Sequence, residues 1–307
     1  MTLDTETSKL LAALLDPEMA PTWQVGAAEA RRRRRAPRVA TDRDAVHRTE
    51  EVAVPIPGGR TVPVRSFWPT EDPPGALLYL PGGGWVLGDN DGNDVLARRL
   101  ALTTGLTVHL VQYSKAPEHP FPAAVEDAAG ALAWAARQEP GRPLHIAGDS
   151  AGANLATVTA IGAREGGPSL ASQILLYPAT DADFGRDSYG DPVAATTILP
   201  AELMAWFWAQ YAPDLAVRTD PRAAPLRAPD LAGLPPTLLF TAEHDVLRDE
   251  GELYAQRLVD AGVEVAHRRF AGQMHGFVSF IGILPAADVA VEAIGEWTRS
   301  TTRREDT

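Results

Sequence analysis

Ser150 is the residue of this chain whose setting points most directly to covalent chemistry. It is the central residue of 148–152 (Gly-Asp-Ser-Ala-Gly), between an apolar run at 144–147 and a stretch of helical spacing at 151–164. A Gly-x-Ser-x-Gly sequence between a strand and a helix is typical of a sharp turn that holds a serine hydroxyl at the top of an α/β sheet. Side chains in place of the two glycines would collide with neighbouring elements. The pattern is short enough to occur by chance, so the interpretation of Ser150 as a nucleophile depends on whether the chain also supplies its catalytic partners.

A base must remove the serine proton, and a neutral imidazole suits this role near pH 7. In hydrolases built on this turn, an acid and then a histidine follow the serine along the chain. Three histidines follow Ser150. His267 falls in an alternating strand and His244 adjoins a candidate acid, whereas His275 lies in a glycine-flanked loop after the last expected strand. We therefore expect His275 to be the base.

The carboxylate that orients this base is expected at Asp245. It comes at the turn after the strand at 237–241, where a side chain can reach back over the sheet edge. Asp249 and Glu250 are placed to cap the next helix and favour its dipole. Glu243 stays open as an alternative acid.

Ester or amide cleavage also needs N–H donors aimed at the oxygen on which negative charge develops. The N–H group of Ala151, directly after the serine, is expected to be one donor. The glycine triplet at 82–84 follows the strand at 76–80, from which this kind of fold draws its other donors. The absence of side chains lets this backbone approach a substrate closely.

Bulk composition excludes several classes of function. The 307-residue chain carries a net charge of −12 and has no cysteine. Nucleic acid and anionic membranes are therefore not expected as main partners, and disulfides, thiolate catalysis and Cys-ligated metals are excluded. No apolar run is long enough to span a bilayer. We expect a cytoplasmic protein that acts on a small molecule without metal or cofactor, and a homodimer is left open.

The elements that must position these residues alternate between strand-like and helix-like segments from about residue 50. Expected strands lie at 51–56, 61–68, 76–80, 106–112, 144–147, 174–177, 237–241 and 263–269, with helices at 91–102, 123–137, 151–164, 250–261 and 286–298. This alternation predicts an α/β fold: a mostly parallel, eight-stranded sheet with helices on both faces.

Two segments interrupt the alternation, and we expect them to form a helical cap. They are 1–45 and 181–215, which leaves 46–180 and 216–307 as the catalytic core. Four aromatic residues are candidates for substrate contact, three of them in the second cap segment: Trp85, Trp206, Phe207 and Trp208. The aromatic cluster either roofs an apolar pocket or anchors the cap to the core, and the sequence leaves both open.

Five consecutive arginines occupy 31–35. On a helix, successive residues turn by about 100°, so the five side chains share no face. We expect a solvated cap helix here, in preference to a polyanion site or a twin-arginine export signal.

Several motifs together resemble the hormone-sensitive-lipase-like group of α/β-hydrolases, the bacterial family IV esterases of the Gly-Asp-Ser-Ala-Gly subgroup. They are 81–89 (Pro-Gly-Gly-Gly-Trp-Val-Leu-Gly-Asp), 113–124 (Tyr-Ser-Lys-Ala-Pro-Glu-His-Pro-Phe-Pro-Ala-Ala), 148–152, 245–250 (Asp-Val-Leu-Arg-Asp-Glu) and 275–277 (His-Gly-Phe). The resemblance implies an α/β-hydrolase fold with a helical cap. It implies Ser150 as nucleophile, Asp245 as acid and His275 as base, and its oxyanion donors fall on Gly83, Gly84 and Ala151.

The implied activity is hydrolysis of short- to medium-chain carboxylic esters through an acyl-serine intermediate. A lactonase, amidase or acyltransferase with the same triad is the alternative. A non-catalytic receptor on this scaffold is disfavoured, because serine, acid and histidine are all present.

Three positions depart from the motifs of the group. Pro81 stands where the group usually has a histidine that orders the glycine loop, and proline lacks an N–H and fixes φ near −65°. We expect a different means of holding this loop. Gln112 and Lys115 also differ from the commonest residues of their motif.

Overall fold

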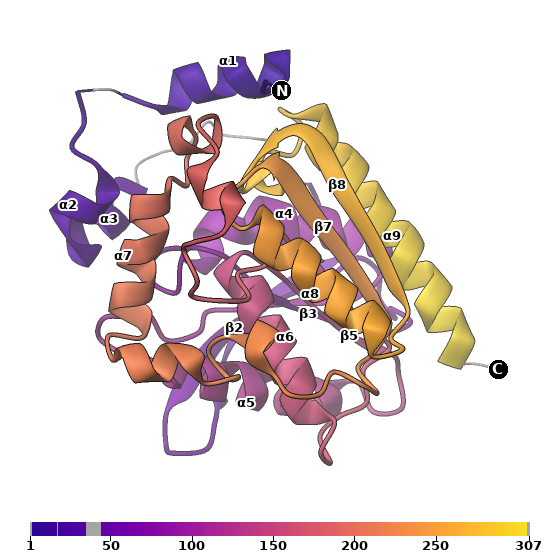
Figure 1. Cartoon of the computed structure of the whole chain (residues 1–307). Coiled ribbons are helices and arrows are strands. Elements are labelled where there is room, and N and C mark those ends of the chain that lie inside the picture. The colour runs from indigo at the N-terminus through magenta and orange to yellow at the C-terminus, as the bar shows by residue number, and fades with distance from the viewer. Residues whose placement is uncertain (1, 17, 35–43, 306–307) are drawn as a thin grey trace.

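A single twisted sheet forms the centre of the molecule (Figure 1). The computed structural model describes residues 2–16, 18–34 and 44–305, and within these ranges eight strands join in the order β1-β2-β4-β3-β5-β6-β7-β8. The strands are β1 (Arg48–Pro55), β2 (Thr61–Trp68), β3 (Ala76–Leu80), β4 (Thr107–Val111), β5 (Leu144–Asp149), β6 (Ser172–Leu176), β7 (Thr237–His244) and β8 (Val265–Met274). Only the pairings β1–β2 and β2–β4 are antiparallel. The predicted fold class, a mostly parallel eight-stranded sheet, is confirmed.

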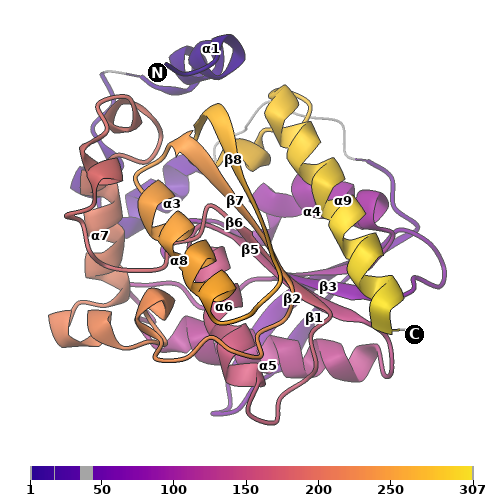
Figure 2. The same ribbon diagram turned by 45° about the vertical axis from the view of Figure 1, so that its right-hand side comes forward.

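Helices cover both faces of the sheet (Figure 2). They are α1 (Thr5–Leu14), α2 (Thr22–Val25), α3 (Ala27–Arg34), α4 (Asn90–Thr104), α5 (Ala123–Gln138), α6 (Ala151–Ala163), α7 (Ala201–Tyr211), α8 (Arg248–Asp260) and α9 (Pro285–Glu305). Apolar side chains of α4 and α9 form one core layer, and those of α5, α6 and α8 belong to the other. Because helices cover both faces, β3 to β6 are buried along their whole length.

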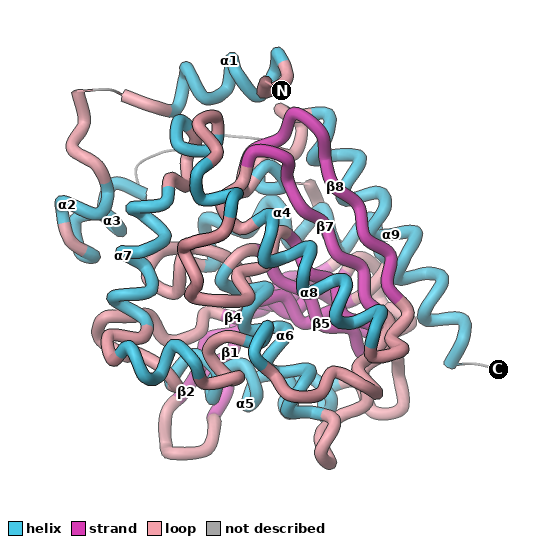
Figure 3. The backbone as a smooth tube through the Cα atoms, in the orientation of Figure 1, coloured by secondary structure: helices cyan, strands magenta, loops and turns pink. Residues whose placement is uncertain are grey.

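The connection between β6 and β7 is long and contains no strand among its described residues (Figure 3). It holds α7 and four short 3-10 turns: η1 (Asp187–Gly190), η2 (Ala194–Thr196), η3 (Leu215–Thr219) and η4 (Pro225–Arg227). The N-terminal helices accompany it, since α2 packs against α7. In addition, the N–H of Asp4 donates to the carbonyl of Gly272 beyond the exposed part of β8, at 3.0 Å.

Two acids after Asp245 bind this connection, which corrects the expectation that they serve as helix caps. Both lie in the first turn of α8, but the Glu250 carboxylate accepts the N–H groups of Thr180 and Asp181 at 2.7 and 3.2 Å. Asp249 accepts the N–H of Ser188 at 2.7 Å. Burial raises the pKa of Glu250 to about 8. These carboxylates therefore join the start of the connection to the core.

The end of β3 crosses the first turn of α6 with no room between the two backbones. A methyl group at Gly152 would lie 1.9 Å from the carbonyl oxygen of Leu80, and one at Gly148 would lie 2.4 Å from the carbonyl of Gly152. Both distances are far below van der Waals contact, and both involve backbone atoms that no rotamer change can move. Glycine is therefore the residue that this crossing accepts.

We predict that Gly152→Ala lowers the free energy of unfolding by about 3 kcal/mol or more, because two backbone segments must separate. Gly162→Ala is the matched control in the same helix. It has no atom within 4 Å of the added methyl group, so it should raise stability by about 0.5–1 kcal/mol through helix propensity. Urea unfolding of both variants measures the difference. Equal stability of the two variants would contradict the close crossing.

Candidate active site

Ser150 occupies a strained turn between β5 and α6. Its φ and ψ are +55° and −120°, a region that costs a non-glycine residue about 1–3 kcal/mol. The N–H of Ser150 donates to the carbonyl of Leu176 at 2.8 Å, which fixes the turn to the neighbouring strand β6. The residue is 7% exposed, so its hydroxyl lies in a largely desolvated setting.

The structure brings Ser150, His275 and Asp245 into one hydrogen-bonded chain. His275 Nε2 lies 2.9 Å from Ser150 Oγ, and His275 Nδ1 lies 2.7 Å from Asp245 Oδ2. When Nδ1–H donates to the carboxylate, Nε2 is left as the acceptor for the serine hydroxyl. Asp245 Oδ1 in turn accepts the N–H of Leu247 at 2.9 Å, which orients the carboxylate. The Tyr177 ring and the imidazole pack in a T-shaped arrangement, with the ring centroids 4.8 Å apart.

The other candidate acid and bases lie outside this chain. Glu243 accepts the N–H of Gly272 at 2.7 Å. His244 Nδ1 contacts Asp191 in the β6–β7 connection, and His267 Nε2 contacts the hydroxyl of Thr241. Of the two acids left open by the sequence, the structure places Asp245 against His275.

The glycine loop (residues 81–88) lies against the serine turn. The N–H of Gly82 donates to Asp149 Oδ1 at 2.7 Å, and a methyl group at Gly82 would lie 2.3 Å from Oδ2 of the same carboxylate. Gly83 and Gly84 have φ values of +123° and +60°, which favour glycine. Within the described part of the chain, the N–H groups of Gly83, Gly84 and Ala151 have no acceptor. All three are thus available to an oxygen of a ligand.

Two tyrosine hydroxyls hold the loop around Pro81. Tyr113 donates to the carbonyl of Pro81 at 2.7 Å, and Tyr79 donates to Asp149 Oδ1 at 2.8 Å. Burial raises the pKa of Asp149, while the bonds from Tyr79 and Gly82 oppose this rise. The loop is therefore anchored through its backbone carbonyl and its next N–H group. Sequence reasoning missed Tyr113 and Asp149, although both lie inside the quoted motifs.

Arg31 holds the outer side of the glycine loop, so the expectation of a solvated arginine helix is wrong for this residue, whereas Arg32 and Arg34 are exposed as expected. Its Nε donates to the carbonyl of Val86 at 2.8 Å, and its Nη2 donates to the carbonyl of Ala116 at 2.6 Å. It also forms a two-pronged ion pair with Glu118. Arg32 and Arg33 instead pair with Glu29 of the same helix. The last arginine of the run, Arg35, lies outside the described residues.

The aromatic candidates divide into two groups. Trp85 and Trp208 have no exposed surface, and Trp85 stacks on Tyr211 with the ring centroids 4.3 Å apart. Because neither can touch a ligand without rearrangement, the structure corrects their assignment as substrate contacts and makes them the anchor between α7 and the glycine loop. The Phe207 ring packs directly on Gly84, where a methyl group would lie 2.1 Å from the ring. Trp206 is partly buried beside it.

A strained serine, a histidine and a carboxylate in this chain order, on a mostly parallel sheet, define a serine hydrolase of the α/β-hydrolase class. The family described as having the alpha/beta hydrolase fold matches residues 77–279. The carboxylesterase NlhH of Mycobacterium tuberculosis is 40% identical over 252 residues, with 78% of each chain covered. The ethyl acetate hydrolase of Pseudomonas putida is 37% identical over 252 residues, with the same coverage.

Solved structures agree with this assignment. A thermostable esterase from Pseudomonas putida ECU1011 superposes with a TM-score of 0.92 at 33% identity, over 98% of each chain. The chain therefore belongs to the hormone-sensitive-lipase-like family of α/β-hydrolases, and the resemblance inferred from its motifs is confirmed.

We predict that Tyr113→Phe lowers the free energy of unfolding by about 1–3 kcal/mol, because the buried carbonyl of Pro81 loses its donor. Tyr211→Phe is the matched control. The Tyr211 hydroxyl is buried without a partner in the described structure, so its removal should leave stability unchanged or slightly higher. Chemical denaturation of the two variants makes the comparison. A Tyr113→Phe protein as stable as Tyr211→Phe would show that this bond does not hold the loop.

Proposed function

We propose that the protein is a serine carboxylic-ester hydrolase that acts on short- to medium-chain acyl esters through an acyl-serine intermediate. The observation that carries this proposal is the buried chain from Ser150 through His275 to Asp245, with contacts of 2.9 and 2.7 Å. The carboxylesterases among its relatives favour ester hydrolysis over the lactonase, amidase and acyltransferase alternatives.

In the first half of the reaction, His275 Nε2 takes the proton of Ser150 as Oγ attacks the ester carbonyl carbon. The N–H groups of Gly83, Gly84 and Ala151 bind the oxygen that becomes negative. Asp245 holds the imidazole tautomer and stabilises the imidazolium. When the tetrahedral intermediate collapses, the C–O bond to the alcohol breaks and His275 passes its proton to the leaving oxygen.

In the second half, water attacks the acyl-serine. His275 takes a proton from this water, the same N–H groups bind the new oxyanion, and the acid leaves as Ser150 regains its proton. No external oxidant, reductant or metal takes part in either half.

Phe207 and Trp206 border the substrate in this proposal. The positions of the two rings support this role, since the Phe207 ring covers the Gly84 face of the glycine loop and Trp206 adjoins Phe207. A bulky ring this close to the oxyanion donors suits small acyl groups. The relative from Pseudomonas putida, named for ethyl acetate hydrolysis, supports the same size class.

The cap in this proposal consists of 1–45 and 181–215, and the remaining segments form the catalytic core. The contact between α2 and α7 supports pairing the two cap segments. No helix in the described ranges is long and apolar enough to cross a membrane. Cytoplasmic location stays a prediction from the sequence, and a homodimer stays open.

The test is hydrolysis of p-nitrophenyl acetate and butyrate by purified variants. We predict that Ser150→Ala and His275→Ala each lower kcat by about 10⁴-fold or more, because nucleophile and base act as one unit. Asp245→Asn should lower kcat by a similar factor, because an amide selects the wrong imidazole tautomer.

Glu243→Gln is the control for the choice of acid, since its amide oxygen can still accept the N–H of Gly272. Its kcat should stay within about threefold of the parent protein, the scale of a change outside a catalytic unit. Ester hydrolysis that survives Ser150→Ala, or that falls equally in Glu243→Gln and Asp245→Asn, would refute the proposed site.

A further inference from the structure

Three consecutive residues of the glycine loop have positive φ values. Glycine accepts this conformation readily at positions 83 and 84, but the third residue is Trp85, with a φ of +57°. Such a backbone costs free energy in a residue other than glycine, and it persists only where surrounding contacts fix it. The same turn carries two of the proposed oxyanion donors, the N–H groups of Gly83 and Gly84. The contacts that fix the turn therefore also set the direction of these donors.

A continuous series of hydrogen bonds runs from Arg31 to one of these donors through two peptide groups. Arg31 Nε donates to the carbonyl of Val86 at 2.8 Å. The N–H of the same peptide group belongs to Leu87, and it donates to the carbonyl of Gly83 at 2.7 Å. The N–H that shares a peptide group with this carbonyl is that of Gly84. Because each peptide group is planar, fixing its carbonyl also fixes the direction of its N–H.

The charge on Arg31 acts along the same series. Hydrogen bonds in a chain polarise one another, and a bond from a charged donor is stronger than one between neutral groups. The guanidinium therefore both orients the two peptide groups and strengthens the last N–H as a donor. An oxyanion donor that is fixed and polarised before the reaction lowers the free energy of the transition state without further reorganisation.

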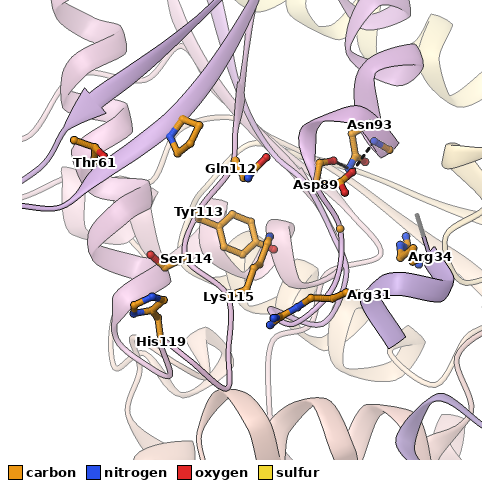
Figure 4. Close-up of a pocket in the computed structure, with 13 residues that line it drawn as sticks. Arg31, Arg34, Thr61, Asp89, Asn93, Gln112, Tyr113, Ser114, Lys115 and His119 are labelled. Carbon is orange, nitrogen blue, oxygen red and sulfur yellow. Dashed lines mark hydrogen bonds between the residues drawn. The ribbon is translucent and has the colours of Figure 1, made fainter. Parts of the chain in front are cut away.

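The guanidinium itself is held from its other side. The Arg31 side chain leaves α3 toward the segment that bears Lys115 (Figure 4), where Nη2 donates to the carbonyl of Ala116 at 2.6 Å. The N–H of Ala116 donates back to the carbonyl of Trp85 at 3.0 Å. Glu118 accepts two further bonds from the guanidinium, at 2.8 and 2.7 Å. Arg31 is thus a fixed bridge between the cap helix and the strained turn.

We propose that Arg31 is a positioning residue for the hydrolytic reaction, an inference that rests on the proposed function. Through the peptide groups 86–87 and 83–84 it aims the N–H of Gly84 at the oxygen that becomes negative. The cap helix α3 thereby determines the geometry of the oxyanion donors. Since the effect falls on the transition state, loss of Arg31 should lower kcat and leave substrate binding nearly unchanged.

Arg31→Ala is compared with Arg33→Ala in the hydrolysis of p-nitrophenyl butyrate. Arg33 lies in the same helix, its side chain is 30% exposed against 24% for Arg31, and it binds Glu29 and the carbonyl of Ala20 within the cap segment. We expect Arg31→Ala to lower kcat by about 10- to 100-fold, the effect of a misplaced but not deleted donor, with KM within about threefold of the parent value. Arg33→Ala should keep the parental kcat and KM.

Two further variants separate the possible routes of the effect. Glu118→Gln keeps an acceptor for Arg31 and leaves its contacts with the carbonyls of Val86 and Ala116, so its kcat should stay at the parental value. If Arg31→Ala does not fold, as judged by circular dichroism, Arg31→Lys is compared with Arg33→Lys. A lysine amine cannot reproduce the guanidinium fork that joins two carbonyls and a carboxylate, so Arg31→Lys should also lower kcat selectively.

The rate at which diethyl p-nitrophenyl phosphate labels Ser150 gives a readout that needs no ester turnover, because its phosphoryl oxygen uses the same donors. Labelling of Arg31→Ala should be slower by a factor similar to that in kcat. A parent chain that is labelled but inactive on esters refutes the proposed function, and the labelling rates then decide the role of Arg31. Equal rates in the Arg31 and Arg33 variants, a loss confined to KM, or an equal loss in Glu118→Gln would overturn the inference. A parent chain neither labelled nor active would overturn both proposals.

Discussion

The crossing of the β3 end over the first turn of α6 is the contact on which the rest of the site depends. Backbone meets backbone there, with no space for a methyl group at Gly152, so the contact cannot relax by a change of rotamer. The same crossing requires Gly148 beneath it and accompanies the positive φ of Ser150. It also carries the chain from Leu80 directly into the glycine loop, which brings the candidate oxyanion donors to the serine. One steric constraint therefore positions both nucleophile and donors.

Catalysis by such donors depends on their being fixed before charge develops, since reorganisation during the reaction would cancel the gain. The glycine loop is held from two sides. On the inner side, Asp149 binds the N–H of Gly82 and Tyr113 binds the carbonyl of Pro81. On the outer side, Arg31 binds the carbonyl of Val86, and the Trp85 ring stacks on α7. Proline in place of the usual histidine is thus compatible with a well-anchored loop, because the anchoring bonds use backbone atoms.

Local patterns in the sequence were sufficient to predict the fold and to predict that Ser150, Asp245 and His275 lie together. Strand and helix periodicity is local, and the order serine, acid, histidine narrows the candidates to few residues. The role of Arg31 could not be found this way, because its partners at Val86 and Ala116 lie 55 and 85 positions away. The role of Glu250 as a helix cap was predicted wrongly for the same reason, since its partners lie 70 and 69 positions earlier in the chain. The burial of Trp208 could have been predicted from the sequence. Met204, Trp208 and Tyr211 are spaced by four and three residues, which places them on one face of α7, and this face is buried.

Stoichiometric labelling with diethyl p-nitrophenyl phosphate tests the central claim, that the strained serine is an activated nucleophile, most directly. The predicted result is one diethylphosphoryl group per chain, mapped by peptide mass spectrometry to Ser150, with loss of ester hydrolysis in proportion to labelling. His275→Ala should slow this labelling sharply, because the proton acceptor of the serine is gone. An active chain that remains unlabelled, or one that is inactivated by labelling elsewhere while Ser150 stays free, would contradict the account.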